Sequence, residues 1–149
     1  MPISELCNRE VIIVETEDSA LEAARLMRKH HVGDVVVIEE QNSIRKPVGI
    51  VTDRDLIVEI MATGLDPAVI TVGDIMASEF VTVKGSAGIF ETIQYMRRKA
   101  VRRSPVIDDS GELVGIITMD DLLQLLSMEL SELTRIVDRE TDKESKQRP

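Results

Sequence analysis

An α/β fold (in finer terms α+β), made of two strand–helix–strand–strand–helix units packed with pseudo-twofold symmetry, is the architecture that the sequence predicts. Three observations support it: the length, the composition and an internal repeat. The chain has 149 residues, of which 43% are hydrophobic and 2% aromatic. It can therefore bury one aliphatic core of ordinary domain size. Neither copy of the repeat can close such a core alone, so the two copies are expected to pack together.

The repeat is visible as two matching segments. Residues 11–38 align with residues 80–107 at an offset of 69 residues, and the PVGIVTDRDL stretch from Pro47 aligns with LVGIITMDDL from Leu113 at an offset of 66. The first copy therefore has three extra residues between these segments. We place the first copy at 1–61, a linker at 62–71, the second copy at 72–133, and the end of the last helix with a polar tail at 134–149.

The elements of the first copy follow from changes in periodicity. The β-branched run at 11–14 predicts a strand. Ser19 and Glu22 have capping-box spacing, and Leu21, Ala24 and Met27 then recur at helical spacing, so a helix follows. Gly33 is expected to stop that helix.

A continuous apolar run at 35–38 predicts a strand covered on both faces. A loop at 39–47, with the three extra residues, and a third strand at 48–52 complete the sheet. Asp53 is expected to cap the second helix. Its apolar positions are Leu56, Ile57, Ile60 and Met61, and Gly64 and Pro67 end it.

The second copy differs at its two helices. The first of them opens with Gly85-Ser-Ala-Gly88, a poorer start than Ser19 provides. The last helix is longer, with Leu122, Leu126, Leu130, Leu133 and Val137 at roughly helical spacing. This stripe packs on its own domain, or its distal part at 130–137 meets a second chain. The polar residues after it are expected to fray.

Composition excludes several classes of protein. The formal net charge of −9 argues against nucleic-acid binding and against docking on anionic membranes. One cysteine, Cys7, allows neither an intrachain disulfide nor a Cys-rich zinc site. His30 and His31 are adjacent and would point apart on a helix, so no metal site is predicted. No apolar run reaches about 18 residues and no signal peptide is visible, so a cytoplasmic protein is expected.

The repeated Thr-x-x-Asp step is the candidate binding element. In each copy a threonine, Thr52 or Thr118, ends a strand and precedes a helix, where unpaired backbone amides make an anion seat. Three residues on, Asp55 or Asp121 lies on the same side, and its carboxylate suits a pair of donors such as ribose hydroxyls. Plain helix capping is the alternative explanation for both residue types.

These motifs resemble the cystathionine β-synthase (CBS) domain, which occurs in tandem pairs called Bateman modules. The resemblance rests on VGIVTDRD at 48–55, VGIITMDD at 114–121 and the segments HHVGDVVVI and AVRRSPVID. It implies that adenosine-containing ligands (AMP, ADP, ATP or S-adenosylmethionine) bind in clefts to which both copies contribute. It also implies a homodimer associated through its helices.

Carried over from the family, the cleft residues form two sets. Thr118 and Asp121 would face Asn8, Val11, Ile12, Gly33 and Asp34. Thr52 and Asp55 would face Ala77, Val81, Arg102, Arg103 and Ser104. Because Arg54, Arg102 and Arg103 would cluster at the first motif, that cleft is expected to prefer phosphorylated nucleotides. Asp34 would add a negative charge to the Thr118 cleft, which is expected to tolerate less charged ligands or to stay empty.

The sequence thus predicts a regulatory module with no catalysis and no catalytic cofactor, which signals to an unknown partner protein through a ligand-driven change of shape. A structural dimerisation module with vestigial clefts is the alternative. An enzyme acting on nucleotides is a third reading, but no general base or metal cluster for it is found.

Overall fold

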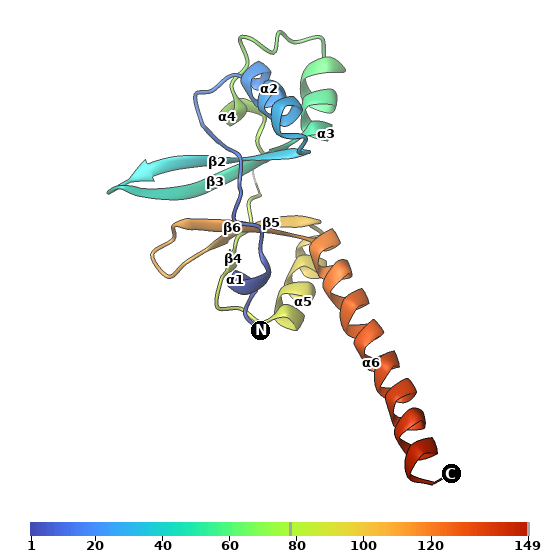
Figure 1. The fold of residues 1–149 in the computed structure, drawn as a ribbon. Coiled ribbons are helices and arrows are strands. Elements are labelled where there is room, and N and C mark those ends of the chain that lie inside the picture. The colour runs from blue at the N-terminus through green and yellow to red at the C-terminus, as the bar shows by residue number, and fades with distance from the viewer. Residues whose placement is uncertain (78, 149) are drawn as a thin grey trace.

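The computed structural model describes residues 1–77 and 79–148. Figure 1 shows two halves that face each other through their sheets, with helices on the outer sides and one long helix projecting from the second half. Each sheet has three strands, in the order β1-β2-β3 and β4-β5-β6. This mixed arrangement of two similar halves confirms the predicted fold class.

The first half contains one long hairpin beside a short parallel strand. β1 pairs parallel with β2, and β2 pairs antiparallel with β3. The β2–β3 turn is tight, since Asn42 and Ser43 both have positive φ. The elements are α1 (Ile3–Leu6), β1 (Ile13–Glu15), α2 (Ala20–His30), β2 (Asp34–Gln41), β3 (Ile44–Thr52), α3 (Asp53–Asp55) and the π-helix η1 (Leu56–Met61).

The second half repeats this order with a shorter hairpin and a longer last helix. β4 pairs parallel with β5, and β5 pairs antiparallel with β6. The elements are α4 (Val72–Ile75), β4 (Val83–Lys84), α5 (Ile89–Lys99), β5 (Arg103–Ile107), β6 (Leu113–Thr118) and α6 (Met119–Gln147). The helix α6 continues to Gln147, so the prediction of a frayed polar tail was wrong for the described residues.

Three apolar clusters hold the molecule together. One lies between the sheet and helices of each half. The third lies between the two sheets, where Val36 and Ile38 of β2 pack with Leu113 and Ile116 of β6. Because the third cluster uses strand residues from both copies, the halves share one aliphatic interior. The interior positions are held by aliphatic side chains, as the composition requires.

The two short helices are exchanged between the halves. Ile3 of α1 is fully buried in the cluster of the second half, and Val72 of α4 is fully buried in the cluster of the first. The residues that follow them, Cys7 and Met76, lie directly over strand glycines. A Cβ at Gly115 would meet Cys7 Sγ at 2.5 Å, and one at Gly49 would meet Met76 Sδ at 2.5 Å. Gly115 is therefore required by a close approach that includes backbone, since a Cβ there would also meet Asn8 O at 2.8 Å, whereas the atom nearest to Gly49 belongs to a flexible side chain.

Several local predictions differ from the structure. The three extra residues of the first copy lengthen the β2–β3 hairpin rather than a loop. His31, with φ of 54°, ends α2 in place of Gly33, because its left-handed backbone turns the chain so that the next amide, that of Val32, donates back to Met27 O at 3.1 Å. The Ser19 hydroxyl accepts a hydrogen bond from the Glu22 amide at 3.1 Å, as predicted. The second bond of a capping box, from the Ser19 amide to the Glu22 carboxylate, does not form. The predicted second helix of the first copy is mostly a π-helix.

Candidate functional site

The threonine and aspartate of each predicted step are joined in a capping box. Thr118 Oγ1 accepts the Asp121 amide at 3.1 Å, and Asp121 Oδ2 accepts the Thr118 amide at 3.1 Å. Thr52 and Asp55 do the same at 3.2 and 2.8 Å. The helix cap is therefore Thr52, and the prediction that Asp53 serves as the cap was wrong. Asp53 is instead the first helical residue.

A third capping box shows that this feature alone does not mark a ligand site. Thr71 and Asp74 form the same two bonds at the start of α4. Asp74 is exposed on the surface of the first half. The capping explanation is thus correct for all three pairs, and what separates Thr118 from Thr71 is the surface opposite it.

The surface opposite Thr118 comes from the other half of the molecule. A pocket of about 130 Å³ lies at the step, and an adjoining one of about 270 Å³ shares Thr118 and Asp34 with it. The first is lined by Asn8, Glu10, Val11, Ile12, Val32, Asp34, Ile116, Thr118 and Asp121. The second is lined by Gly33, Asp34, Arg102, Arg103, Thr118, Met119 and Asp120. We call these two pockets together the Thr118 cleft.

All five residues expected opposite Thr118 and Asp121 line the Thr118 cleft. A backbone bridge fixes this juxtaposition, because Asn8 and Ile116 exchange two hydrogen bonds of 2.9 Å. Glu10, Val32, Met119 and Asp120 were not singled out from the sequence. Each of them lies within two positions of a predicted site residue, and this proximity was the signal that the sequence offered.

The residues expected opposite Thr52 are brought together only in part. Ser104 is fully buried, and its hydroxyl donates to the Val81 carbonyl at 3.1 Å. Ala77 is exposed and follows Met76, which covers β3 at Gly49. Neither pocket of the Thr118 cleft includes Thr52 or Asp55. Val81, Ser104 and Ala77 line neither pocket of the Thr118 cleft.

The arginines are not confined to the first motif. Arg102 and Arg103 line the Thr118 cleft, and Arg103 Nη1 forms an ion pair with Asp34 Oδ2 across the two halves. The negative charge of Asp34, which was expected to repel anions there, is therefore compensated. Arg54 is exposed at the start of α3. A Cβ at Gly33 would lie 3.3 Å from Asp53 Oδ2 and 3.8 Å from Arg103 Nη1, so Arg103 also lies beside the first motif, and the cluster of three arginines there stays a prediction.

The backbone amides at the two helix starts also differ. In α3 the first three have partners, because the Asp53 amide donates to Gly33 O, the Arg54 amide to Asp53 Oδ1, and the Asp55 amide to Thr52 Oγ1. In α6 the Met119 amide donates to Arg102 O and the Asp121 amide to Thr118 Oγ1.

The amide between them, that of Asp120, has no recorded hydrogen-bond partner among the described residues. The difference arises because Asp53 caps the amide of the next residue, whereas Met119 at the matching position cannot. An anion at the start of α6 can therefore receive a backbone hydrogen bond that α3 uses internally.

Other reactive groups do not join the Thr118 cleft. Cys7 is buried, and this burial raises the pKa of its thiol above the ordinary value, with the Arg9 charge opposing the shift. The thiol is thus a packing group, as its alignment with Met76 predicted. Among residues 1–77 and 79–148 no group of three or more His, Cys, Asp or Glu side chains could hold a metal ion.

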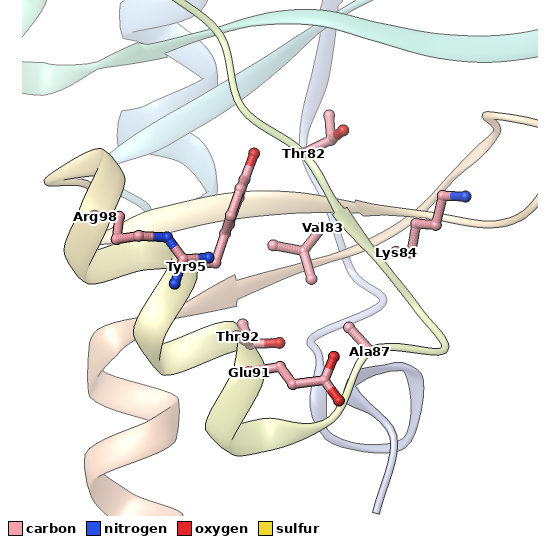
Figure 2. Close-up of a pocket in the computed structure, with 8 residues that line it drawn as sticks. All are labelled: Thr82, Val83, Lys84, Ala87, Glu91, Thr92, Tyr95 and Arg98. Atoms are coloured by element: carbon pink, nitrogen blue, oxygen red, sulfur yellow. The ribbon is translucent and has the colours of Figure 1, made fainter.

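A further pocket of about 330 Å³ lies between β4 and α5 and is lined by residues of the second half alone (Figure 2). Lys84, Glu91, Tyr95 and Arg98 contribute its polar groups, and the hydroxyl of buried Thr92 already donates to Gly88 O at 2.8 Å. None of its residues belongs to either predicted set. No helix in the described parts of the chain is both long and apolar enough to cross a bilayer.

Comparison with known proteins agrees with the fold and the repeat. The model of the CBS domain matches twice, at residues 3–62 and 72–128. Uncharacterized protein MK0525 of Methanopyrus kandleri is 37% identical over 123 residues, which cover 83% of this chain and 61% of that relative. The chain therefore matches less than two thirds of that relative's length.

Two solved structures have the same architecture. The crystal structure of Hypoxic Response Protein I with two coordinated zinc ions is 31% identical, with a TM-score of 0.72, covering 83% of this chain and 98% of that one. The CBS domain pair of protein MJ0100, in complex with 5-methylthioadenosine and S-adenosyl-L-methionine, is 24% identical with a TM-score of 0.74. That match covers 87% of this chain and 98% of the other and supports the fold alone.

Proposed function

The chain belongs to the CBS domain family as a tandem pair, and from this we propose that it is a regulatory module that binds an adenosine-containing ligand between its two repeats. The observation that carries the proposal is the Thr118 cleft, where a capped helix start of one repeat faces apolar and polar side chains of the other. The adjoining volumes together are within the range of small-molecule sites, about 300–1,000 Å³.

Each part of such a ligand has a matching group in the Thr118 cleft. Val11 and Ile12 are half-buried and present an apolar wall for a purine base. The Asp121 carboxylate has a second oxygen beyond the one bound to the Thr118 amide, and it suits ribose hydroxyls. For a phosphate, the Asp120 amide and the Arg102 and Arg103 guanidinium groups are donors on one side of the cleft.

This assignment reverses the predicted preference of the clefts. We propose that the Thr118 cleft takes the charged ligand, because it has an amide without an internal partner and two arginines beside it. The Thr52 step keeps Val81, Ala77 and Ser104 as proposed neighbours, but Asp53 already occupies the amide that a phosphate would use. A ligand there would have less charge, as S-adenosylmethionine and 5-methylthioadenosine do; both are bound by the MJ0100 pair.

The ion pair between Asp34 and Arg103 gives the ligand a way to act on shape. It joins the two halves at the edge of the Thr118 cleft, and its side chains are 19% and 31% exposed. An anion that draws Arg103 toward itself weakens this pair and favours another orientation of the halves. A partner protein that reads this orientation, and a cytoplasmic location, complete the proposal.

A homodimer is also part of the proposal. Ile57 of η1 and Leu123 of α6 occupy matching positions of the two repeats, and they are 56% and 55% exposed. Next to Leu123, an apolar groove of about 410 Å³ lies between α5 and α6. Apolar helix faces at equivalent places in both halves support association of two copies through their helices.

The test is binding of AMP, ATP and S-adenosylmethionine, measured by calorimetry and by thermal shift. We expect at least one ligand to raise the melting temperature, since a ligand that binds only the folded state stabilises it. Asp121→Ala should weaken binding of that ligand by about 10-fold or more, as expected for a charge-assisted bond of roughly 1.5–3 kcal/mol. Asp74→Ala is the matched control, since it removes the same type of capping carboxylate outside the Thr118 cleft.

The alternatives give different results. No thermal shift at millimolar ligand would favour a structural dimerisation module whose clefts are vestigial. Equal losses of affinity in Asp121→Ala and Asp74→Ala would show that the aspartate acts through stability alone. Conversion of ATP to a product would favour an enzyme.

A further inference from the structure

The distal part of α6 carries apolar side chains that nothing in the described chain covers. Every residue of α6 from Leu126 to Gln147 is exposed, and the helix projects away from the second half (Figure 1). Leu130, Leu133 and Val137 are 60–63% exposed. A long helix in a protein is stabilised mainly by the packing of an apolar face. An exposed apolar stripe on such a helix therefore indicates a surface that binds a partner.

The stripe has the spacing of a coiled coil. Its members recur at alternating steps of three and four residues, which place them at successive a and d positions of a heptad. We call these five residues the α6 seam: Leu123, Leu126, Leu130, Leu133 and Val137. The same steps occur where a helix packs on a globular body, but this face of α6 is exposed, so the pattern points to pairing with another helix.

Charges are arranged to leave the seam free. Arg135 pairs with Glu132, and Lys146 pairs with Asp142, both within the helix and away from the seam. The positions that flank the seam hold Ser127, Glu129, Thr134 and Ile136, so two parallel copies would bring no like charges together there. Seam positions after Val137 hold Glu140 and Glu144, which would face their own copies in a parallel pair, so like-charge repulsion ends the contact there.

We infer that the α6 seam pairs in parallel and in register with the α6 seam of a second copy of this chain. The apolar half of α6 begins inside the groove that Ile93, Met96 and Leu122 line, while its far half is charged. In parallel the apolar halves meet and the groove continues into the seam. In an antiparallel pair each a position faces a d position of the other helix. Leu123 would then face Glu140, and one apolar contact of the α6 seam would be lost.

Pairing through the α6 seam also determines which halves of the two copies come into contact. The α6 seam supplies only five layers of facing side chains, fewer than three to four heptads would supply. A free coiled coil needs that length, so the groove beside α5 must contribute to the same interface. Two copies joined in this way place second half against second half. This inference deepens the proposed homodimer and rests on it, but it does not depend on the proposed ligand binding, since α6 beyond Leu123 lines neither pocket of the Thr118 cleft.

Sedimentation equilibrium of the full chain tests the interface. Leu130→Ser is expected to raise the dimer dissociation constant about 10-fold or more, the effect of losing roughly one buried leucine per chain. Met128→Ser is the matched control, because Met128 is equally exposed at 60% but points away from the seam. A wild-type chain that stays monomeric at about 100 µM, or equal effects of the two variants, would overturn the inference.

Disulfide trapping tests the direction. Under mild oxidation Leu133→Cys should form a covalent dimer on a non-reducing gel, because residue 133 meets its own copy in a parallel pair. Met128→Cys should not. If Leu133→Cys crosslinks only when mixed with Leu130→Cys, the pairing is antiparallel and the parallel assignment fails. Calorimetric titration with AMP on the Leu130→Ser variant separates this outcome from any failure of ligand binding.

Discussion

The two Thr-x-x-Asp steps have the same cap and different neighbours, and the difference shows what a duplicated motif leaves free to vary. Both threonines and both aspartates close a capping box. Between them, the first copy has Asp53, which takes up the amide of Arg54, and the second has Met119, which takes up none. The cap fixes the helix start, and the residue after the threonine decides whether a backbone donor remains for an anion.

The same contrast appears where each exchanged helix meets the opposite sheet. Gly115 lies against a backbone oxygen of the first copy, since a Cβ there would meet Asn8 O at 2.8 Å as well as Cys7 Sγ. Gly49 lies mainly against the flexible side chain of Met76. A duplicated contact has thus become rigid on one side and adaptable on the other.

The largest predicted effect comes from adding a methyl group to each of the two strand glycines. Gly115→Ala should lower the free energy of unfolding by about 3 kcal/mol, at the upper end for overpacking, because a backbone oxygen must move. Gly49→Ala should cost only about 1 kcal/mol, since the Met76 side chain can change rotamer. Urea unfolding monitored by circular dichroism gives both values. Equal midpoints for the two variants would contradict the difference in rigidity.

An exchange of the residues after the two threonines would sharpen the comparison of the clefts. Met119→Asp should occupy the Asp120 amide and weaken binding of a phosphorylated nucleotide about 10-fold, equivalent to roughly 1.4 kcal/mol. Asp53→Met should release the Arg54 amide and strengthen binding at the Thr52 step. Calorimetric titration with AMP measures both effects. If Met119→Asp leaves AMP affinity unchanged, the amide does not contact the ligand.

The smallest effect concerns the starts of α2 and α5. Ser19 caps α2, whereas Gly88 at the matching start of α5 has no side-chain cap. Ser19→Ala should cost about 1 kcal/mol, and Gly88→Ser should add a few tenths of a kcal/mol. A Cβ at Gly88 would have ordinary contacts, 3.5 Å from Glu91 Oε1, so strain does not mask the gain. Thermal unfolding of both variants checks the order, and a loss on Gly88→Ser would contradict it.

Local patterns and the repeat were sufficient to predict the strand–helix–strand–strand–helix order of each half, whereas the residues opposite Thr118 were predicted from the family resemblance. Alignment alone equated Cys7 with Met76, and both cover a strand glycine. It predicted neither α1 nor α4, nor that each covers the opposite sheet, because a four-residue helix has too short a pattern to be recognised. A glycine inside each third strand was the available signal, since it marks a close approach by another segment.

Charge placement could not be predicted in the same way. Arg103 and Asp34 occupy matching positions of the two copies, so each was assigned to a different cleft by family resemblance. In three dimensions matching positions meet at the pseudo-twofold axis, where the two side chains pair with each other. The occupancy of the Arg54 amide likewise depends on a side-chain rotamer that no spacing reveals.

The exchange of α1 and α4 has a consequence for synthesis of the chain on the ribosome. The first sheet cannot complete its interior until Val72 and Met76 have left the exit tunnel, although its own strands and helix end well before them. The earliest residues, including Ile3, must wait until β5 and β6 exist. Folding is therefore delayed until β6 and the start of α6 have been made, and the two halves become stable together rather than one after the other.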